Sequence, residues 1–345
     1  MTRLTNRLLN RLPKVLIYGD DGIDQDIVIN LSIFYTKMGY QIIVSTELHE
    51  ADILVLTRVT RPLENLDFID RYELINYWSY VGEFEDESFI EKSRERLVMI
   101  STDVEKLQAC ELLNPHGLYF NLNNPVYPKF WTSLNLKSEK KYNSVHIGNY
   151  KSFLSVEKDC PGFNFLEFCR LHKVSVWGNG WLSSNLPFDL NCGPLKLEEV
   201  PRIYRQSEVS FGIMYPDQRG RFVSGRFWLG PINGCLMYTE AILPHQEIPG
   251  VYYFDYQKLR FPKELQQSRN LALEARVFWT QSTKSAFEII KNANLRKRHH
   301  NFALLTISSA FGLIRLVKRY WKFYLKLTLV SGLIQQTRVT GSREL

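Results

Sequence analysis

Residues 223–240 read VSGRFWLGPINGCLMYTE, and this stretch indicates a short helix that returns directly into a strand. The apolar helical segment is interrupted at Gly230 and Pro231, because proline lacks the backbone N–H that a helix interior needs. Gly234 then permits the turn into the strand-like run CLMYT at 235–239. A helix that leads straight into an apolar strand is typical of sheets covered by helices. The same alternation extends in both directions along the chain.

Short apolar runs in the N-terminal part of the chain predict buried strands. A helical pattern between two of them ends at Gly39. Strands that alternate with helices favour a parallel sheet covered on both faces. The predicted strands are KVLIY (14–18), QIIVS (41–45), DILVL (52–56) and RLVMIS (96–101), and the predicted helix covers 26–38.

A stretch rich in Asn, Pro, Ser and Lys at 122–142 predicts a linker, after which the alternation restarts. We expect an α/β protein with two Rossmann-like domains, and a ligand in the crevice at the carboxyl ends of the strands. The predicted parts are an N-terminal domain (1–130), a linker (131–142), a second domain (143–290) and a basic helical tail (291–345). Beyond the linker, strands are expected at 143–148, 173–178, 208–214, 235–239 and 251–255, and helices at 163–172 and 197–206.

The net charge of +7 is concentrated in the tail. Residues 291–345 hold 11 Lys/Arg and one acidic residue, a local charge of +10, which leaves 32 basic and 35 acidic residues, or −3, in the body. A nearly neutral body argues against a general nucleic-acid-binding protein. At 345 residues, 45% hydrophobic and 23% charged, the chain has the composition of a folded protein with about two domains.

The five cysteines have no CxxC spacing, so we expect neither a disulfide framework nor a zinc site. The N-terminus contains no apolar run long enough for a signal-peptide core. No uninterrupted apolar stretch of about 18 residues occurs, so no membrane-spanning helix is expected. These features predict a cytoplasmic protein.

Three blocks follow one another in the second half: NSVHIGNYKS (143–152), KVSVWGNGW (173–181) and SGRFWLGPING (224–234). Their order and spacing resemble the C-terminal domain of GT-B glycosyltransferases, most closely the spore-maturation-protein-like group, over residues 142–260. The resemblance implies a GT-B fold, with two Rossmann-like domains that face a central cleft. It also implies a hexosyl- or related glycosyltransferase that takes a nucleotide-sugar donor as substrate, with no cofactor and no metal, in a process such as polysaccharide biosynthesis.

The resemblance also implies donor-binding residues in the second half. Arg226 stands at the family's arginine, Trp228 at its aromatic residue and Gly234 at its glycine. Arginines beside glycines and a helix start suit a diphosphate, because guanidinium groups and backbone N–H groups both bind anions. For the two tryptophans of KVSVWGNGW, core packing and pocket lining are equally expected. The predicted donor-binding residues are Gly148, Asn149, Trp177, Gly178, Trp181, Arg219, Arg221, Arg226 and Gly234.

The chain departs from the family pattern at two positions. Leu229 replaces a glutamate that typically binds the donor's ribose, and Arg221 stands where retaining relatives have a second acidic residue. An alternative hypothesis is therefore a non-catalytic GT-B module for binding or assembly. A third is a basic protein that binds surfaces through its tail.

A base that takes a proton from the acceptor is expected in the N-terminal domain. The candidates are Asp20 and Asp24, together with Asp21 in the GDDG turn, and Glu83. Acidic residues in such turns also serve turn geometry alone. His146, within a predicted strand, is expected to be a buried and hydrogen-bonded residue rather than a catalytic one.

Residues 311–330, FGLIRLVKRYWKFYLKLTLV, interleave basic residues with large apolar ones. This composition is typical of a helix that lies in a membrane interface, and equally of a helix that packs across the domains. The expected partners are a nucleotide-diphosphate sugar, a glycan or lipid-linked acceptor, and an anionic membrane surface at 311–330; no nucleic acid is expected. The predicted location is cytoplasmic, with peripheral attachment to the inner face of the cell membrane.

Overall fold

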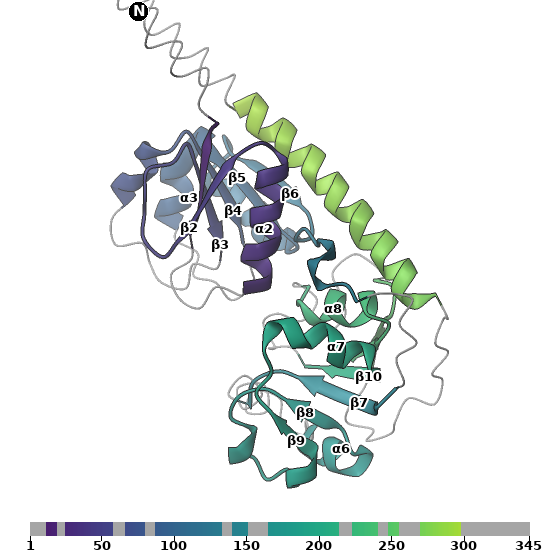
Figure 1. The fold of residues 1–345 in the computed structure, drawn as a ribbon. Coiled ribbons are helices and arrows are strands. Elements are labelled where there is room, and N and C mark those ends of the chain that lie inside the picture. Colours follow the sequence, from purple (N-terminus) through teal and green to yellow (C-terminus); the bar gives the residue numbers. More distant parts are fainter. Residues whose placement is uncertain are drawn as a thin grey trace, which may run out of the picture. The chain divides into compact units, whose positions relative to one another are not determined.

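The computed structural model describes residues 12–18, 25–57, 66–79, 87–132, 140–150, 165–213, 223–240, 248–254 and 270–297. The chain divides into a compact unit at 1–294 and a second unit at 295–345. The first unit contains two six-stranded sheets, and every strand pair in them is parallel. The α/β class and the two Rossmann-like halves predicted from the sequence are therefore confirmed (Figure 1). The predicted amphipathic segment at 311–330 lies outside the described residues.

The strands of the first sheet have the order β2-β1-β3-β4-β5-β6. Two of them, β1 and β2, have the bounds expected from their apolar runs, whereas β4 and β6 were not predicted. The strands are β1 (Lys14–Tyr18), β2 (Gln41–Ser45), β3 (Ile53–Thr57), β4 (Leu74–Trp78), β5 (Leu97–Ser101) and β6 (Leu118–Asn121).

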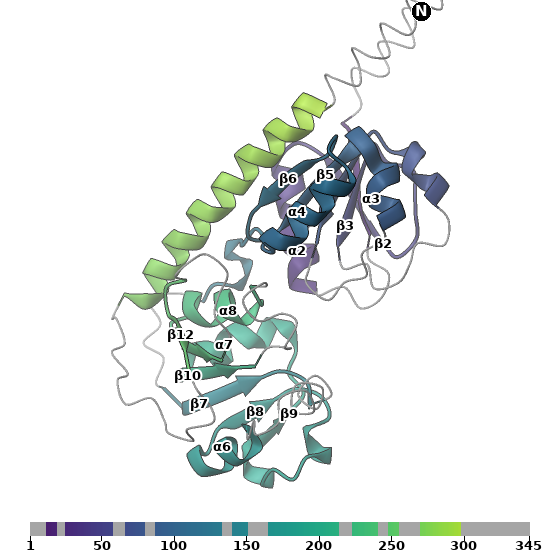
Figure 2. The same ribbon diagram turned by 180° about the vertical axis from the view of Figure 1, so that it is seen from behind.

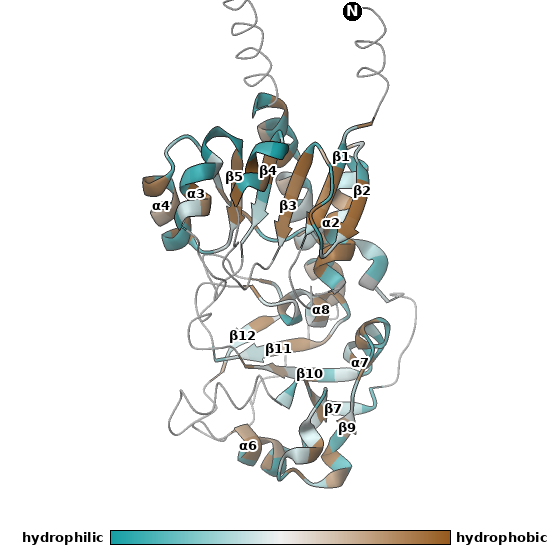
Figure 3. Cartoon of the chain, turned by 90° about the vertical axis from the view of Figure 1, so that its left-hand side faces the viewer, coloured by the Kyte–Doolittle hydropathy of each residue, from teal (hydrophilic) through white to brown (hydrophobic). Residues whose placement is uncertain are grey.

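Helices cover both faces of the first sheet. The helix α2 (Gln25–Lys37) packs on the face that carries Val15 and Ile17, and successive strand residues point to opposite faces, so Leu16 belongs to the other core. That second face is covered by η1 (Leu66–Arg71), α3 (Glu87–Ser93) and α4 (Val104–Leu113), which Figure 2 shows from behind. Burial on both faces is consistent with the hydrophobic colour that β1, β3 and β5 have along most of their lengths in Figure 3.

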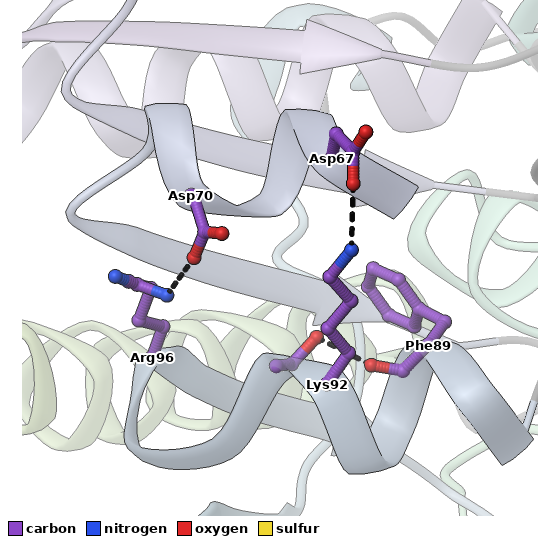
Figure 4. Close-up of polar contacts among 6 residues, drawn as sticks. Asp67, Asp70, Phe89, Lys92 and Arg96 are labelled. Carbon is purple, nitrogen blue, oxygen red and sulfur yellow. Dashed lines mark hydrogen bonds and ion pairs between the residues drawn. The ribbon is translucent and has the colours of Figure 1, made fainter. Parts of the chain in front are cut away.

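Two ion pairs connect η1 with α3 and with η2 (Arg94–Arg96) (Figure 4). Lys92 Nζ lies 3.0 Å from Asp67 Oδ1, and Arg96 Nη1 lies 2.7 Å from Asp70 Oδ1. Both carboxylates are largely exposed, so each pair stabilises the fold by roughly 0.2–1 kcal/mol. The apolar residues beneath these pairs, rather than the pairs, hold this layer on the sheet.

The second sheet has the order β12-β11-β10-β7-β8-β9. The five strands expected after the linker are all present, and the short β9 was not predicted. The strands are β7 (Tyr142–Ile147), β8 (Ser175–Trp177), β9 (Asn191–Gly193), β10 (Ser207–Gly212), β11 (Leu236–Thr239) and β12 (Val251–Tyr253). The helical segments are α6 (Phe165–His172), η4 (Trp181–Ser183), η5 (Phe188–Leu190), η6 (Leu197–Glu199), α7 (Val200–Arg205) and α8 (Arg226–Ile232).

A helix that covers 271–297 was not predicted from the sequence, and it joins the cores of both halves. Ala275 and Trp279 belong to the core between the second sheet and helices α7 and α8. Ile290, about three turns beyond Trp279, belongs to the core between the first sheet and α2. One helix therefore contributes buried apolar area to both halves of the chain. Across the described residues, no helix is both long enough and apolar enough to span a membrane.

The polar stretch that begins at residue 122 includes η3 (Pro128–Phe130) and is held by hydrogen bonds from distant elements. Val126 N donates to Thr283 Oγ1 at 2.9 Å, and Tyr127 N donates to Asn30 Oδ1 at 3.1 Å. Arg276 Nη2 donates to the carbonyl oxygen of Thr132 at 2.6 Å. These bonds satisfy backbone groups of a buried crossing that lies outside any sheet or long helix.

Candidate functional site

Both sheets contain a point at which the strand order changes direction. In the first sheet the chain moves from β1 to β2 on one side and then to β3 on the other; in the second it returns past β7 to β10. Loops that leave neighbouring strands at such a point diverge and leave a crevice at the carboxyl ends of the strands. The segments that follow β1, β7 and β10 are therefore the places where a ligand site is expected.

A pocket of about 750 Å³ lies at these strand ends, within the unit 1–294. Its lining comes from α2, from the segments that follow β5 to β9, from α7 and α8, and from the helix at 271–297. The lining residues are Asp26, Ile27, Asn30, Leu31, Thr102, Asn123, Asn124, Pro125, Ile147, Asn149, Asn179, Leu195, Leu197, Val200, Tyr204, Val223, Ser224, Gly225, Arg226, Trp228, Leu229 and Trp279.

Two opposite charges face this pocket. Among the described lining residues, Asp26 is the single carboxylate and Arg226 the single basic side chain. Asp26 lies in the first turn of α2, and Arg226 is the first residue of α8. A methyl group built on Gly225 would lie 3.2 Å from Asp26 Oδ2, so the start of α8 approaches this carboxylate closely. A carboxylate that can accept a proton and a guanidinium group that can bind an anion therefore line the same cavity.

Among the described residues, Arg226 has one hydrogen-bond partner. Its Nη1 donates to the carbonyl oxygen of Ile213 at 2.8 Å, just after β10. Its Nη2 lies beside Gly148, where a Cβ atom would be only 3.1 Å away. The half-buried guanidinium is thus held against the end of β7 with part of its donor fork available to a ligand.

His146 lies behind this arginine and is neutral at physiological pH. Its Nδ1 donates to the carbonyl oxygen of Phe211 at 2.8 Å, which leaves Nε2 without a proton in the neutral ring. Burial and the nearby Arg226 charge lower the pKa of His146 to about 3. The expectation of a buried, hydrogen-bonded histidine is confirmed.

The loops after β7 and β8 are joined through their glycines and asparagines. Asn179 N donates to Asn149 Oδ1 at 3.0 Å, and Tyr150 N donates to the carbonyl oxygen of Asn179 at 2.9 Å. Gly178 has φ +140, and a Cβ atom there would lie 2.0 Å from the carbonyl oxygen of Gly148. Only glycine permits this approach, which sets both asparagines in the pocket wall.

Residues 223–240 fold largely as their sequence predicts. The helix α8 has seven residues, contains Pro231, and is followed by Gly234 with φ +76 in the turn to β11. Its N-cap residue is Gly225, and no side chain caps this end of the helix. The carbonyl oxygen of Ser224 accepts a hydrogen bond from Phe227 N at 2.9 Å. The arginine at the head of the helix is the group that faces the pocket.

The predicted donor-binding residues fall into separate groups. Asn149 and Arg226 line the pocket, and Gly148 and Gly178 form the close backbone contact beside it. Trp181 is buried in a core, Trp177 is half-buried against another, and Gly234 lies at the far end of α8. The remaining candidates, Arg219 and Arg221 for the donor and Asp20, Asp21, Asp24 and Glu83 for the base, lie outside the described residues.

Sequence analysis missed Asp26, Asn30 and the asparagines after β6, all of which line the pocket. Asp26 had a detectable signal, because it is acidic, follows the first strand closely and opens a helix. Asn123 and Asn124 lie in the stretch at 122–142 that was interpreted by its composition alone, without a ligand-binding role. The described part of the chain contains no cluster of three His, Cys, Asp or Glu residues that could hold a metal ion.

Leu229, the position of the family's glutamate, lies in the pocket wall and is 6% exposed. Its neighbour Trp228 also lines the pocket, so this part of the wall is apolar. A ribose held here would contact hydrocarbon and indole surface rather than a carboxylate.

No protein-family model matches the sequence, and no curated protein matches it closely enough to count as a relative. Among solved structures, the chain resembles the DNA-modifying enzyme β-glucosyltransferase, determined with and without its substrate uridine diphosphoglucose, at 13% identity and a TM-score of 0.51. That alignment covers 81% of this chain and 99% of the enzyme.

Two further likenesses have TM-scores below 0.5 and add nothing to the fold assignment. One is T4 phage BGT in complex with UDP-glucose (13% identity, TM-score 0.44, 84% of this chain and 98% of that one). The other is a TarM mutant of S. aureus in complex with UDP (10% identity, TM-score 0.42, 72% of this chain and 54% of that one). The two parallel sheets and the first likeness together identify the fold as GT-B, as the sequence predicted.

Proposed function

We propose that this GT-B chain is a glycosyltransferase that moves a sugar from a nucleotide-diphosphate donor to a hydroxyl group of a glycan, lipid-linked or protein acceptor. The observation that carries this proposal is the shared pocket of Asp26 and Arg226, one from each half of the chain. A sugar transfer needs a group that accepts a proton and a group that stabilises a leaving diphosphate. The pocket contains one of each.

The donor is bound by the second half. Arg226 offers a guanidinium fork whose position is set by Ile213, and the absent side chains of Gly148 and Gly178 keep the neighbouring backbone close. A diphosphate carries about two negative charges and suits such a fork. Asn149 and Asn179 supply uncharged groups for the remaining oxygens of the donor.

The chemical step uses the two charges in turn. The Asp26 carboxylate takes the proton of the acceptor hydroxyl as its oxygen forms a bond with the anomeric carbon. The bond between that carbon and the diphosphate oxygen breaks, and the diphosphate leaves with the electron pair. Its new negative charge lies opposite Arg226, where the attraction is greatest in the transition state. No cofactor and no metal enters this scheme.

The alternative hypothesis of a non-catalytic module rests on Leu229. A pocket without the ribose-binding carboxylate holds a nucleotide less specifically, and such a chain would bind a ligand without turnover. The two hypotheses differ in one measurable quantity, the release of nucleoside diphosphate from a nucleotide sugar.

The test is thermal unfolding of the full chain with a panel of nucleoside diphosphates. A nucleotide present at about 100 times its dissociation constant stabilises the fold by about 2.7 kcal/mol. Arg226→Ala should abolish this stabilisation and Arg226→Lys should retain part of it, whereas Arg202→Ala, at an exposed residue on α7, should retain all of it. No stabilisation of the wild-type chain by any nucleotide would contradict the proposal. Binding without diphosphate release would favour the non-catalytic module.

A further inference from the structure

The pocket wall formed by α2 and by the segments after β5 and β6 is rich in uncharged polar side chains. It presents Asn30, Asn123, Asn124 and Thr102 beside the carboxylate of Asp26. This wall comes from the half of the chain opposite to Arg226, so it is available to the second substrate of the proposed reaction. The inference below rests on that proposed function and specifies its acceptor.

Asn30 is the most informative residue of this wall. Its exposed fraction is only 3%, yet only one of its two amide groups has a hydrogen-bond partner among the described residues. Its Oδ1 accepts from Tyr127 N at 3.1 Å, which fixes the orientation of the amide. Its NH₂ group has no hydrogen-bond partner among the described residues, and the residue lines the pocket. Because the residue lines the pocket, this amide donor is placed to bind a ligand or a water molecule there.

Three other buried asparagines, Asn76, Asn114 and Asn233, use their NH₂ groups within the protein. Asn76 Nδ2 donates to Tyr35 Oη at 2.8 Å, and Asn233 Nδ2 donates to the carbonyl oxygen of Leu229 at 2.9 Å. Asn114 Nδ2 contacts two carbonyl oxygens, each at 3.0 Å. Asn30 differs from these three because its free donor belongs to a pocket.

Asp26 and Asn30 lie four residues apart on α2 and therefore on one face of the helix. Side chains at this spacing are neighbours, with Cβ atoms about 6 Å apart. The carboxylate accepts hydrogen bonds, and the amide NH₂ donates them. Hydroxyl groups do both, so two hydroxyls on adjacent carbons of a sugar ring match the pair. An anionic group would instead be repelled by the Asp26 charge.

We infer that the acceptor is an uncharged sugar with free neighbouring hydroxyls, bound against Asp26 and Asn30 with Asn124 as a further contact. Asp26 accepts the hydroxyl that reacts, and Asn30 donates to the oxygen of the hydroxyl beside it. The same wall disfavours acceptors that carry carboxylate, phosphate or a nucleic-acid backbone.

The test measures binding of methyl glycosides to the full chain by saturation-transfer NMR, without nucleotide. The panel pairs the methyl glycosides of glucose, galactose, mannose and N-acetylglucosamine with the uronates of the first three, and adds a single-stranded DNA oligonucleotide. At least one neutral glycoside should bind at least ten times more tightly than its uronate. Equal or tighter binding of the uronates or of DNA at the pocket, or no binding of any neutral glycoside, would overturn the inference.

Asn30→Asp tests the donor directly, because the carboxylate keeps the acceptor for Tyr127 N and removes the NH₂ group. The Asn30→Asp variant should bind the neutral glycoside with an affinity about tenfold lower than that of the wild-type chain. The matched control is Asn185→Asp, at an exposed residue between η4 and η5. An unchanged affinity in Asn30→Asp would contradict the assignment. Nucleoside diphosphate binding is measured separately, so failure of the donor site and failure of the acceptor wall give different patterns.

Discussion

The indole Nε1 of Trp181 donates a hydrogen bond to the main-chain carbonyl oxygen of Gly148 at 2.6 Å. This bond ties the segment after β8 to the segment after β7, at the point where the second sheet changes direction. The same carbonyl oxygen excludes any side chain at Gly178. Residues 178–181 (GNGW) therefore hold the loop after β8 against the loop after β7 and so fix this part of the pocket wall. Trp181 contributes through its hydrogen bond while its ring is buried in a core.

Gly178→Ala should be strongly destabilising. The new Cβ atom would lie 2.0 Å from the carbonyl oxygen of Gly148, in a backbone conformation of φ +140 that side chains rarely adopt. Relief requires the two loops to separate, and we expect a loss of about 3 kcal/mol or more in the free energy of unfolding. Denaturant titration of both proteins measures the difference.

Gly193→Ala provides the control for this prediction. Gly193 also has a positive φ, +80, but nothing lies within 4 Å of its Cβ position. We expect a loss of about 1–2 kcal/mol from backbone strain alone. Equal losses in the two variants would show that the contact with Gly148 is unimportant.

The stability of the chain should fall as the pH drops below 6.5, because of His146. The unfolded histidine takes up a proton near pH 6.5, whereas in the folded chain its pKa is about 3. The stabilisation is complete above pH 6.5 and is lost progressively as the pH falls toward 3. Between pH 6.5 and 5 the loss is about 2 kcal/mol.

His146→Asn should reduce the pH dependence of the unfolding free energy over this range, even if the variant is less stable throughout. Asparagine keeps a donor near the position of Nδ1, for the carbonyl oxygen of Phe211, but does not titrate. His49→Asn changes an exposed histidine and should leave the slope unchanged. Urea titrations at several pH values give the slopes, and an unaltered slope in His146→Asn would refute the assignment.

Asp26→Asn should lower the rate of sugar transfer by about 10²–10⁴-fold, because the amide cannot take the acceptor's proton. The affinity for nucleoside diphosphate should change little, since Arg226 is retained. Turnover of a nucleotide sugar and nucleotide binding are measured on the same preparation. Asp189→Asn, at an exposed residue of η5, is the control, and full activity in Asp26→Asn would exclude this residue as the base.

Arg276→Met should destabilise the chain by about 2–4 kcal/mol. Arg276 is buried, with an exposed fraction of 7%. Its guanidinium group donates to the carbonyl oxygens of Ile232 (2.8 Å) and Thr132 (2.6 Å) and lies over the ring of Trp131. Its removal leaves two carbonyl groups without donors. Arg202→Met, which disrupts only an exposed pair with Glu199, should cost less than about 0.5 kcal/mol, and equal losses would contradict the prediction.

Much of the fold was predictable because local patterns determine its elements. The runs KVLIY and QIIVS became strands with the expected bounds, since short apolar runs favour the strands of a parallel sheet. The central residues of KVLIY are buried, whereas QIIVS forms an edge strand whose residues are at most partly buried. The strand β6 (LYFN) and the strand β9 escaped prediction because they are only four and three residues long. Their positions in the sheets depend on pairing with β5 and β8, which lie outside the short sequence segments from which strands are predicted.

The sequence by itself determined the α/β class and the two-sheet architecture, because the periodicities of strands and helices are properties of a few adjacent residues. Only the tertiary structure decided that Asp26 and Arg226, 200 positions apart in the chain, line one pocket. Only it decided that the helix at 271–297 contributes to two cores. Both outcomes depend on strand order and on packing between distant segments, and local periodicity carries no information about either.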